Sequence, residues 1–282
     1  MDKGLYAVVG NPVSHSKSPR IHSLFAQQTG ENLEYTAIQA PLDGFPAVVT
    51  DFFDRGGQGL NVTVPFKEQA WKLADWRTER AEKAGAANTL YLDADKNLTA
   101  DNTDGHGLVT DLMQNHDVVL ADARVLVLGA GGAVRGVLAP LLSQAPAALT
   151  IANRTTARAQ GLVLLFAEDA RGADLEACGF AAAAGPFDII INGTSASLQG
   201  DLPPLSPSVI GPGTVVYDMM YSLDATPFNQ WALDQGATRV FDGLGMLVHQ
   251  AALQQRIWLG GDAVIDTSAM RAAAEAALAG RS

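Results

Sequence analysis

Apolar residues along this chain fall into short runs, and stretches with helical spacing separate the runs. Nine runs of five to seven residues have the length and composition of β-strands. They are residues 5–10, 34–40, 59–64, 88–93, 123–129, 148–153, 187–193, 214–219 and 238–242. The later runs are continuously apolar, which is typical of a parallel sheet that is covered on both faces. The alternation of strands with helices predicts an α/β fold.

Several helix ends are marked by capping and breaking residues. Ser18 precedes Pro19 and an apolar helical face, and Gly30 follows it, which predicts a helix with Ser18 as its N-cap. Pro65 predicts the start of a second helix. Residues 245–282 contain no convincing strand and predict two helices, of which the second is rich in alanine.

The chain has 282 residues, and a domain usually has about 150. This length predicts two domains, although no Ser/Gly-rich linker separates them. We expect residues 1–105 to form the first domain and residues 106–244, which hold the five apolar strands, to form the second. The helices of residues 245–282 are expected to pack back on the first domain.

Charge and cysteine content narrow the choice of partners. The 30 acidic residues outnumber the 19 basic ones, for a formal charge of −11, which argues against nucleic acid and anionic membranes as partners. A small anionic ligand would need a local basic pocket. The single cysteine, Cys178, excludes a disulfide within the chain and is expected to fill apolar space.

Metal binding and membrane insertion are not expected. In the stretch "DNTDG", Thr103 and Gly105 stand where a calcium loop needs ligands. The N-terminus has too short an apolar stretch for a signal peptide, and residues 125–152 are interrupted by Arg135 and two prolines. We therefore expect a cytoplasmic protein without a metal ion.

A glycine-rich turn joins a predicted strand to a predicted helix in "VLVLGAGGAVRG". Gly129, Gly131 and Gly132 would permit a tight turn and a close approach of the backbone to a pyrophosphate at the helix N-terminus. Val134 departs from the usual pattern, which has a small residue at this position. The pattern predicts a dinucleotide site of the Rossmann type, and a glycine-rich turn without a ligand is the alternative.

The strand after this turn ends near Asn153, where NAD-binding proteins usually carry an acidic residue. Arg154 and Arg158 follow instead. Guanidinium groups bind a 2′-phosphate, which a carboxylate would repel. These residues predict NADP as the cofactor, and two solvated arginines on a surface helix are the alternative.

Lys67 and Asp104 are candidates for proton transfer. A lysine in the first helical turn faces the positive end of the helix macrodipole, which costs about 0.3–1 kcal/mol. Such a lysine is better explained by acid–base chemistry than by stability, although a solvated side chain is the alternative. Asp104 precedes a helical pattern, so capping that helix is the alternative to a chemical role.

Eight stretches in order resemble the motifs of the shikimate dehydrogenase family. They are "GNPVSHSKSP", "NVTVPFK", "GAANTL", "DNTDG", "GAGGAVRG", "NRT", "YDMMY" and "DGLGMLVHQA", and they extend from residue 10 to residue 251. The resemblance implies a substrate domain followed by a Rossmann-type, doubly wound NADP-binding domain. It also implies reversible, NADP-dependent reduction of 3-dehydroshikimate to shikimate, on the route to chorismate and the aromatic amino acids.

The resemblance also assigns roles by position in these motifs. Ser16 and Ser18 would bind the substrate carboxylate, with Thr63 nearby. Lys67 and Asp104 would be catalytic, and with Asn88 they would surround the reacting C3 oxygen and its neighbouring hydroxyl. The other substrate contacts would be Asn61, Tyr221 and Gln250. The cofactor contacts would be Glu79, Gly129, Ala130, Gly131, Gly132, Ala133, Asn153, Arg154, Thr155, Arg158, Met219 and Gly243.

Two other functions are left open by the sequence. A sister enzyme would also oxidise quinate or use NAD, and the arginine pair speaks against the use of NAD. A catalytically silent NADP-binding regulator would be expected to lack Lys67 or Asp104, and both are present. The sequence does not fix the oligomeric state, and a homodimer is left open.

Overall fold

The computed structural model describes residues 3–14, 16–194, 201–260 and 265–278. The chain forms two compact units, residues 1–107 with 247–282 and residues 108–246. Each division lies two residues beyond the boundary expected from the sequence.

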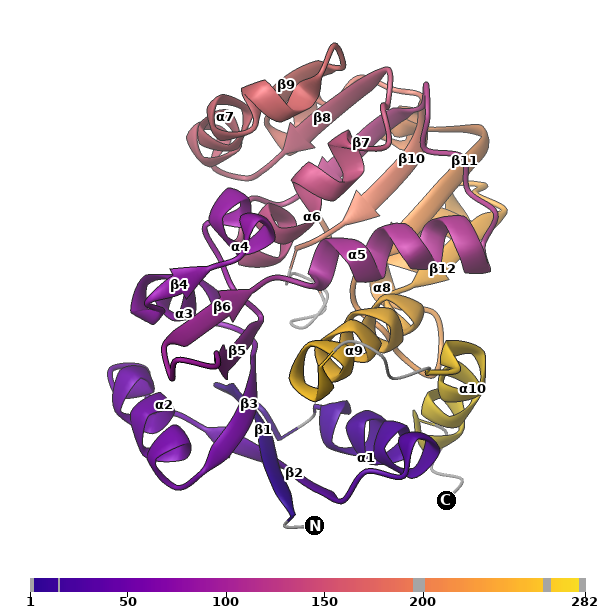
Figure 1. Ribbon diagram of the computed structural model, residues 1–282. Coiled ribbons are helices and arrows are strands. Elements are labelled where there is room, and N and C mark those ends of the chain that lie inside the picture. The colour runs from indigo at the N-terminus through magenta and orange to yellow at the C-terminus, as the bar shows by residue number, and fades with distance from the viewer. Residues whose placement is uncertain (1–2, 15, 195–200, 261–264, 279–282) are drawn as a thin grey trace. The chain divides into compact units, whose positions relative to one another are not determined.

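The first unit contains a six-stranded mixed sheet in the order β2-β1-β3-β5-β6-β4 (Figure 1). Its strands are β1 (Gly4–Gly10), β2 (Leu33–Gln39), β3 (Gly57–Val62), β4 (Trp76–Arg77), β5 (Thr89–Leu92) and β6 (Leu98–Asp101). Strand β1 is parallel to both of its neighbours, and β5 is antiparallel to β3 and β6. The carboxyl ends of β1 and β3 therefore share one edge of the sheet, where ligands commonly bind in open α/β sheets.

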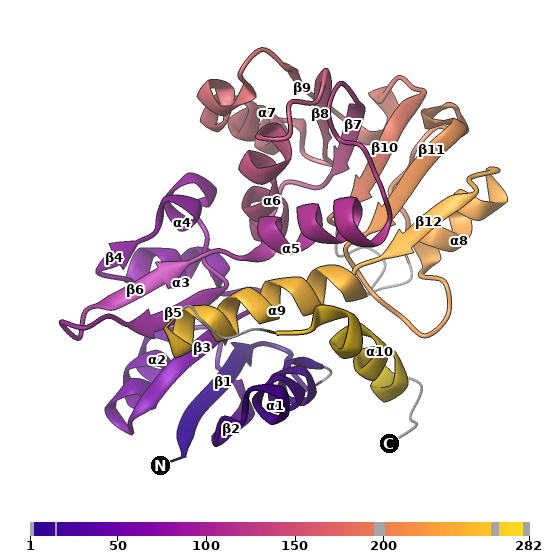
Figure 2. The same ribbon diagram turned by 45° about the vertical axis from the view of Figure 1, so that its right-hand side comes forward.

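Helices cover this sheet, and two of them come from the end of the chain. Those that lie wholly in the first unit are α1 (Ser18–Thr29), α2 (Phe45–Asp54), α3 (Lys67–Leu73), α4 (Glu79–Ala84) and α10 (Thr267–Leu278). Helices α5 (Asp104–Thr110) and α9 (Leu244–Leu259) each run from one unit into the other. Helix α10 lies beside α1 (Figure 2), and residues 247–282 group with the first unit.

Two expected helix starts were wrong by one or two residues. Helix α1 begins at Ser18 itself, with Lys17 at the N-cap position, and the Ser18 N–H donates to Ser16 Oγ at 3.3 Å. Ser18 is therefore not the N-cap, and its own N–H is bound by the Ser16 side chain. Helix α3 begins at Lys67, because the preceding residues form a turn in which the Phe66 N–H bonds to Thr63 O.

The second unit contains a six-stranded parallel sheet in the order β12-β11-β10-β7-β8-β9. The strands are β7 (Arg124–Leu128), β8 (Ala148–Ala152), β9 (Asp174–Cys178), β10 (Phe187–Asn192), β11 (Ile210–Asp218) and β12 (Arg239–Asp242). The helices are α6 (Gly132–Leu142), α7 (Thr156–Leu165), α8 (Pro227–Asp234), the π-helix η1 (Asp111–Asn115) and the 3-10 helices η2 (Ala167–Ala170), η3 (Phe180–Ala182) and η5 (Pro207–Val209). This strand order is that of a doubly wound Rossmann sheet, as predicted.

Apolar side chains alternate between the two faces of this sheet. Val125 and Val127 of β7 belong to a core that includes Leu138 of α6, whereas Leu126 belongs to a core that includes Phe228 of α8. Because both faces are covered, every position of such a strand can be apolar. The prediction of a parallel sheet with helices on both faces is confirmed.

Three strands were not predicted from the sequence. Strand β4 has only two residues, and β6 ("LTAD") mixes polar and apolar positions. Strand β9 ("DLEAC") lies at the edge of its sheet and is partly exposed, so it lacks a continuous apolar run. Short strands and edge strands bury little surface, so they do not need a continuous run of apolar residues. The other strands were predicted from such runs.

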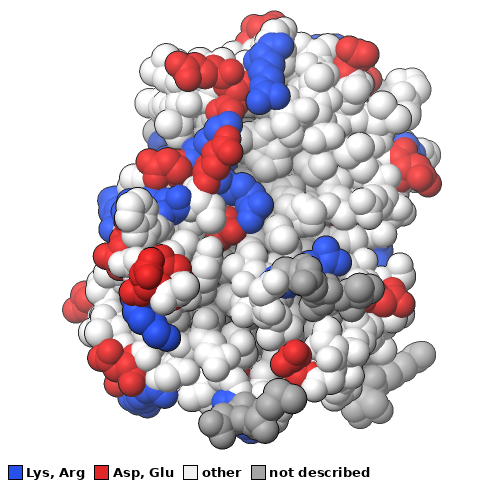
Figure 3. All heavy atoms as spheres, viewed as in Figure 1, with Lys and Arg blue, Asp and Glu red and all other residues white. Residues whose placement is uncertain are grey.

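The outer surface carries charges of both signs. On the face shown in Figure 3, acidic and basic side chains are interspersed over much of the charged area. Within the described ranges, no helix is both long enough and apolar enough to cross a membrane.

Candidate functional site

In the first unit, Lys67 and Asp104 form a largely buried ion pair. Lys67 is the first residue of α3, and its Nζ donates to Asp104 Oδ2. The side chains are only 13% and 6% exposed. Asp104 is the first residue of α5 rather than its N-cap, and its own N–H donates to Asn102 Oδ1 at 3.1 Å. The carboxylate of Asp104 is thus committed to the lysine and not to helix capping.

Asn88, at the end of the loop before β5, connects this ion pair to α9. Its Nδ2 lies 2.8 Å from Asp104 Oδ1 and 2.9 Å from Gln250 Oε1. Its Oδ1 accepts from the Thr103 N–H at 3.0 Å and from Thr89 Oγ1 at 2.8 Å. Donors and acceptors on both sides fix the orientation of the Asn88 amide.

Gln250 of α9 presents its oxygen to this network. Asn88 Nδ2 and Gln254 Nε2 each lie 2.9 Å from Gln250 Oε1, and Thr103 Oγ1 lies at 3.3 Å. Since these bonds all use the oxygen, the amide hydrogens of Gln250 remain for another acceptor. A hydroxyl or carbonyl oxygen of a ligand would suit them.

A second polar group lies at the shared edge of β1 and β3. Tyr35 donates its hydroxyl to Asn61 Oδ1, and the Tyr35 hydroxyl is also within hydrogen-bonding reach of Ser18. Burial raises the pKa of Tyr35 well above its ordinary value, so this hydroxyl stays protonated and can donate. With its oxygen occupied, Asn61 turns its Nδ2 toward Asn88 O at 3.5 Å. The structure thus brings Ser18 and Asn61 together through Tyr35, which sequence reasoning missed.

Thr63 and Ser16 lie in the loops that follow these two strands. Thr63 follows β3, and its N–H bonds to Val9 O at 3.0 Å. The methyl group of Thr63 fills the space where a side chain on Gly10 would lie, so the close approach of the two strand ends requires glycine. Ser16 precedes α1 and is partly exposed. The N-terminal part of α1 and these hydroxyls form a setting that favours a carboxylate.

Glu79 belongs to a different environment within the first unit. It is the first residue of α4, is exposed, and pairs with Lys83 at 3.2 Å. The neighbouring buried carboxylate is that of Asp101, which receives two bonds from Arg80 at 3.0 and 2.6 Å. Arg80 and Asp101 therefore have a structural explanation. The predicted contact of Glu79 with the cofactor stays a prediction.

In the second unit, the glycine turn between β7 and α6 has space for a ligand. Gly129 has φ +109, which favours glycine, and a Cβ there would lie 3.1 Å from Gly193 O. Gly131 has an ordinary φ, and no described protein atom lies within 4 Å of the position of its Cβ. Packing therefore does not explain Gly131, whereas the close approach of a pyrophosphate would.

The N-terminus of α6 is suited to hold an anion. Gly131 is its N-cap and makes no side-chain capping bond, and the first turn contains no acidic residue. The N–H groups of Gly132 and Ala133, in the first turn of α6, therefore have no acceptor within the helix. Val134, which departs from the usual motif, is fully buried, and its methyl group occupies the space beside Gly193. Gly193 at the end of β10 thus supplies the space that a small residue at position 134 would supply.

The segment after β8 presents the predicted phosphate-binding arginines. Asn153 donates its Nδ2 to Thr155 O at 2.9 Å, which leaves its Oδ1 as an acceptor. Arg154 and Arg158 are exposed, and in the part of the chain that the structure describes neither forms an ion pair. Two guanidinium groups suit a 2′-phosphate, and a ribose hydroxyl alone would not need them. The residues present therefore fit NADP.

Three further predicted residues lie near the carboxyl ends of β11 and β12. Met219 Sδ lies 3.1 Å from the position of a Cβ on Gly193, and the Met219 N–H bonds to Asn192 O at 2.9 Å. Gly243 follows β12, and the Met219 carbonyl occupies the space of its missing side chain. Tyr221 lies in the turn after β11. Met219 and Gly243 are thus brought together, beside the glycine turn.

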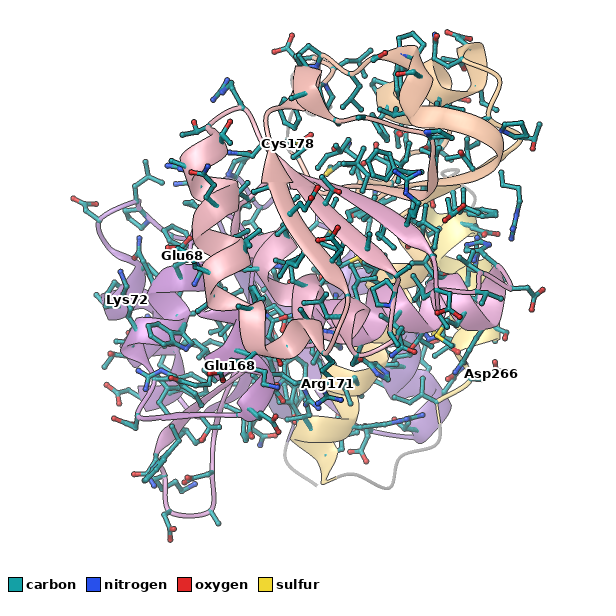
Figure 4. All side chains as sticks on the ribbon, turned by 90° about the horizontal axis from the view of Figure 1, so that it is seen from above. Glu68, Lys72, Glu168, Arg171, Cys178 and Asp266 are labelled. Carbon is teal, nitrogen blue, oxygen red and sulfur yellow. The ribbon has the colours of Figure 1, made fainter. Side chains whose placement is uncertain are left out.

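Cys178 is the single cysteine of the chain and was expected to fill apolar space. Cys178 is the last residue of β9 (Figure 4), is partly exposed and has no disulfide. Burial raises the pKa of its thiol, with a smaller contribution from Glu176, so the reactive thiolate is disfavoured. No group of three or more potential ligands within the described residues could hold a metal ion.

Comparison with known protein families identifies the family to which this chain belongs. Three family profiles match in succession: the shikimate dehydrogenase substrate binding domain at residues 8–90, shikimate / quinate 5-dehydrogenase at 111–199, and the shikimate 5'-dehydrogenase C-terminal domain at 243–275. The chain belongs to the shikimate dehydrogenase family. The resemblance stated from its motifs is confirmed.

Individual relatives match over nearly the whole chain. Shikimate dehydrogenase (NADP(+)) of Marinobacter nauticus is 68% identical over 92% of this chain and 94% of its own length. The crystal structure of an Ael1 enzyme from Pseudomonas putida is 45% identical, with a TM-score of 0.87 over 96% of this chain and 98% of its own. Shikimate 5-dehydrogenase from Thermus thermophilus, in complex with NADP(H) and shikimate, is 31% identical, with a TM-score of 0.83 over 98% of this chain and 100% of its own.

Three polar residues of the first unit were missed by sequence reasoning. Thr103 and Gln254 take part in the Asn88–Gln250 network, and Tyr35 bonds to Asn61. Thr103 lies within "DNTDG", where it was considered only as a possible calcium ligand. Gln254 lies one helical turn after Gln250, and this spacing is a signal that could have found it. Tyr35 lies on a strand and offered no comparable signal.

Proposed function

We propose that this protein is an NADP-dependent shikimate dehydrogenase that interconverts 3-dehydroshikimate and shikimate. The observation that supports this proposal most strongly is the buried pair of Lys67 and Asp104, joined through Asn88 to Gln250. This group combines a proton donor, a carboxylate and two oriented amides in one place. A polyhydroxylated ring that carries one reacting oxygen needs such a set of partners.

Lys67 is the residue that moves the proton. Its ammonium group donates to the C3 oxygen as the ketone becomes an alcohol, and the neutral amine accepts the proton in the reverse reaction. Asp104 holds the Lys67 Nζ in place and accepts a bond from the neighbouring hydroxyl. NADP, when bound, carries the hydride of this reaction.

The carboxylate end of the substrate is held by the residues at the edge of β1 and β3. Ser16, Ser18 and Thr63 offer hydroxyl donors, and Asn61 adds its amide. Tyr35 holds the side chains of Asn61 and Ser18 in place, because its hydroxyl bonds to Asn61 and lies within hydrogen-bonding reach of Ser18. The distance along the sheet edge from these residues to Lys67 would determine the size of the substrate ring that can bind. Gln250 would bind a ring hydroxyl through its amide hydrogens.

Residues of the second unit would hold the cofactor. Gly129, Gly131 and the N–H groups at the start of α6 would bind the pyrophosphate. Arg154 and Arg158 would bind the 2′-phosphate, with Asn153 and Thr155 on the adjacent ribose. Met219 and Gly243 would lie against the nicotinamide half.

The test is a spectrophotometric assay of NADP reduction by the purified protein. Addition of shikimate should start the reduction of NADP, and quinate or NAD in its place should support a much lower rate. A reaction that requires shikimate and NADP together is the expected result. Equal rates with quinate, or with NAD, would indicate the sister enzyme of broader specificity, and NADP binding without turnover would indicate a silent regulator.

Two further expectations accompany this activity. The proposed reaction belongs to the synthesis of chorismate and aromatic amino acids, which places the enzyme in the cytoplasm where those amino acids enter proteins. A homodimer stays a prediction, and light scattering of the purified protein measures it directly.

A further inference from the structure

Asp218, the last residue of β11, is a fully buried carboxylate surrounded by hydrogen-bond donors. Thr226 Oγ1 donates to Oδ2 at 2.6 Å. Asn192 Nδ2 and the Met220 N–H donate to Oδ1 at 3.0 and 3.1 Å. Asp218 and Asn192 have no solvent exposure, and Thr226 is 1% exposed. Because all three neighbours donate, the site is arranged for an ionised carboxylate.

The orientation of Asn192 follows from its other bonds. Its Oδ1 accepts from the Thr194 N–H at 3.1 Å and from Thr194 Oγ1 at 2.7 Å. A backbone N–H can only donate, so Oδ1 must face Thr194 and Nδ2 must face Asp218. The backbone O of Asn192 also accepts from the Met219 N–H at 2.9 Å. Asp218 and Asn192 together therefore hold two successive amides, those of Met219 and Met220.

The turn held in this way carries a residue of the proposed cofactor site. The Met219 side chain lies against Gly193, and Gly193 O lies against Gly129 of the glycine turn. The Gly243 N–H bonds to Met220 O at 2.9 Å, so the turn also connects to the end of β12. The ends of β7, β10, β11 and β12 thus meet at the turn that Asp218 holds.

Burial brings the pKa of Asp218 close to neutral pH. Burial raises the pKa of Asp218 to about 6, although bonds from Thr226, Met220 and Asn192 oppose the shift. Asp242 on β12 adds a smaller upward effect, and it bonds to the N–H groups of Leu244 at 3.2 Å and Ser222 at 3.4 Å. Below this pH the protonated carboxyl has a hydrogen of its own, and it can no longer accept from all three donors.

We propose that Asp218 is a positioning residue for the cofactor, whose carboxylate, together with Asn192 and Thr226, fixes the turn that places Met219 against the nicotinamide. The inference rests on the proposed function for the role of Met219. It adds a residue that acts through the turn rather than by contact with the cofactor. It also predicts that this placement is lost when the carboxylate takes up a proton.

The first experiment follows the Met219 methyl group by NMR in the ligand-free protein. Methionines are labelled at the methyl carbon, and the Met219 signal is identified by its absence in Met219→Leu. Between about pH 8 and pH 5 its chemical shift should move with a midpoint near that of Asp218. In Asp218→Asn the signal should be displaced and should not titrate. A pH-independent signal in the unaltered protein overturns the inference.

A matched pair of variants at Thr226 tests whether the hydrogen bonds set that midpoint. Thr226→Val removes one donor to Asp218, so the midpoint should move to higher pH. Thr226→Ser keeps the hydroxyl, both toward Asp218 and as the cap of α8, and should leave the midpoint unchanged. If both variants keep the original midpoint, the titration does not belong to Asp218 and the inference fails. Circular dichroism establishes that each variant is folded.

Cofactor affinity then links the turn to function. Asp218→Asn should raise the dissociation constant of NADPH by roughly 10- to 100-fold at about pH 8, because the contact surface for the nicotinamide is displaced. The same measurement with NADH removes the 2′-phosphate, which itself titrates near pH 6. Normal binding of both cofactors by Asp218→Asn, despite a displaced Met219 signal, overturns the inference and leaves the proposed function standing. A failure of the unaltered protein to bind NADPH overturns both.

Discussion

At the scale of single residues, Lys67 and Lys72 show that two lysines of one helix can have different tasks. The Lys67 side chain is 13% exposed and pairs with Asp104. Lys72 is exposed on α3 and lies near Glu68 on the outer side of that helix (Figure 4). Burial of a charge is expensive without a partner, so the enclosed pair needs a chemical reason. Proton transfer to a substrate oxygen supplies that reason.

Lys67→Ala should therefore lower the turnover number with shikimate by roughly 10²–10⁴-fold, because general acid–base catalysis contributes about that much. The dissociation constant for NADP should change little. Lys72→Ala is the matched control and should retain normal turnover. Steady-state kinetics of both variants make the measurement.

A different kinetic pattern would contradict this assignment. If Lys67 only holds a hydroxyl of the substrate, Lys67→Ala raises the Michaelis constant and spares turnover. Asp104→Asn should give a defect similar to that of Lys67→Ala, and the double variant should be little worse than either. Residues that act on one oxygen are not additive.

At the scale of elements, the turn between β7 and α6 separates two reasons for glycine. Gly129 has φ +109, and a Cβ on it would press against Gly193 O. Gly131 has φ −94 and open space around its missing side chain. The first glycine is required by the backbone of the protein, whereas the second is explained only by a ligand.

Gly129→Ala and Gly131→Ala should accordingly fail in different ways. Gly129→Ala should lower the free energy of unfolding by about 1–3 kcal/mol, since an L-residue is strained at positive φ. Gly131→Ala should cost less than about 1 kcal/mol and should still weaken NADPH binding by roughly tenfold or more. Thermal unfolding and fluorescence titration with NADPH give the two quantities. Normal NADPH binding by a stable Gly131→Ala protein would remove this turn from the cofactor site.

At the scale of the whole molecule, His22 is expected to set the response of the first unit to acid. It is completely buried, stacks on Tyr35 with ring centroids 4.4 Å apart, and bonds to Gln255 at 3.0 Å. Burial lowers its pKa from 6.5 to about 4, although bonds to Gln255, Gln254 and Asn61 oppose this. The unfolded chain takes up this proton near pH 6.5 and the folded chain only near pH 4. Between these values the unfolded state binds more protons, so stability falls as pH falls.

The free energy of unfolding of the first unit should therefore drop by up to about 3 kcal/mol from pH 6.5 to pH 4. In His22→Gln this drop should largely disappear. Urea titrations in a Trp231→Phe background measure it, because the remaining tryptophans, Trp71, Trp76 and Trp258, all belong to the first unit. An equal drop in both proteins would assign the acid response to other groups.

Two acidic residues of the second unit, Asp218 and Asp111, have pKa shifts of opposite sign, so pH changes affect stability through them in opposite directions. Burial raises the pKa of Asp218 to about 6, so the folded state gains protons there and the second unit is stabilised as pH falls from about 6 toward 3.8. The pKa of Asp111 is lowered: burial alone would raise it, but bonds from His116, Tyr217 and Asn115 outweigh burial. The stability that Asp111 contributes is present above pH 3.8 and is lost below it.

Much of the architecture could be read from the sequence, because local periodicity and turn residues are properties of neighbouring positions. The apolar runs predicted the central strands of the parallel sheet, and the glycines of "GAGGAVRG" predicted where a nucleotide would bind. Lys67 was placed in the first turn of a helix, and it is the first residue of α3. Asn153 and the two arginines predicted NADP, which agrees with the family relatives. These features depend on spacing within about ten residues.

Only the tertiary structure decided which distant polar groups meet. Asn88 and Gln250 are 162 positions apart and bond directly, and Thr89 and Gln254 are 165 apart. Tyr35 of β2 reaches Asn61 of β3 across the intervening strand β1, and nothing in its local sequence distinguishes it from a core tyrosine. A buried polar atom must find a partner wherever the fold provides one, and no local pattern records that choice. The sequence by itself determined the elements and the family, and the packing of those elements determined how its polar side chains are held.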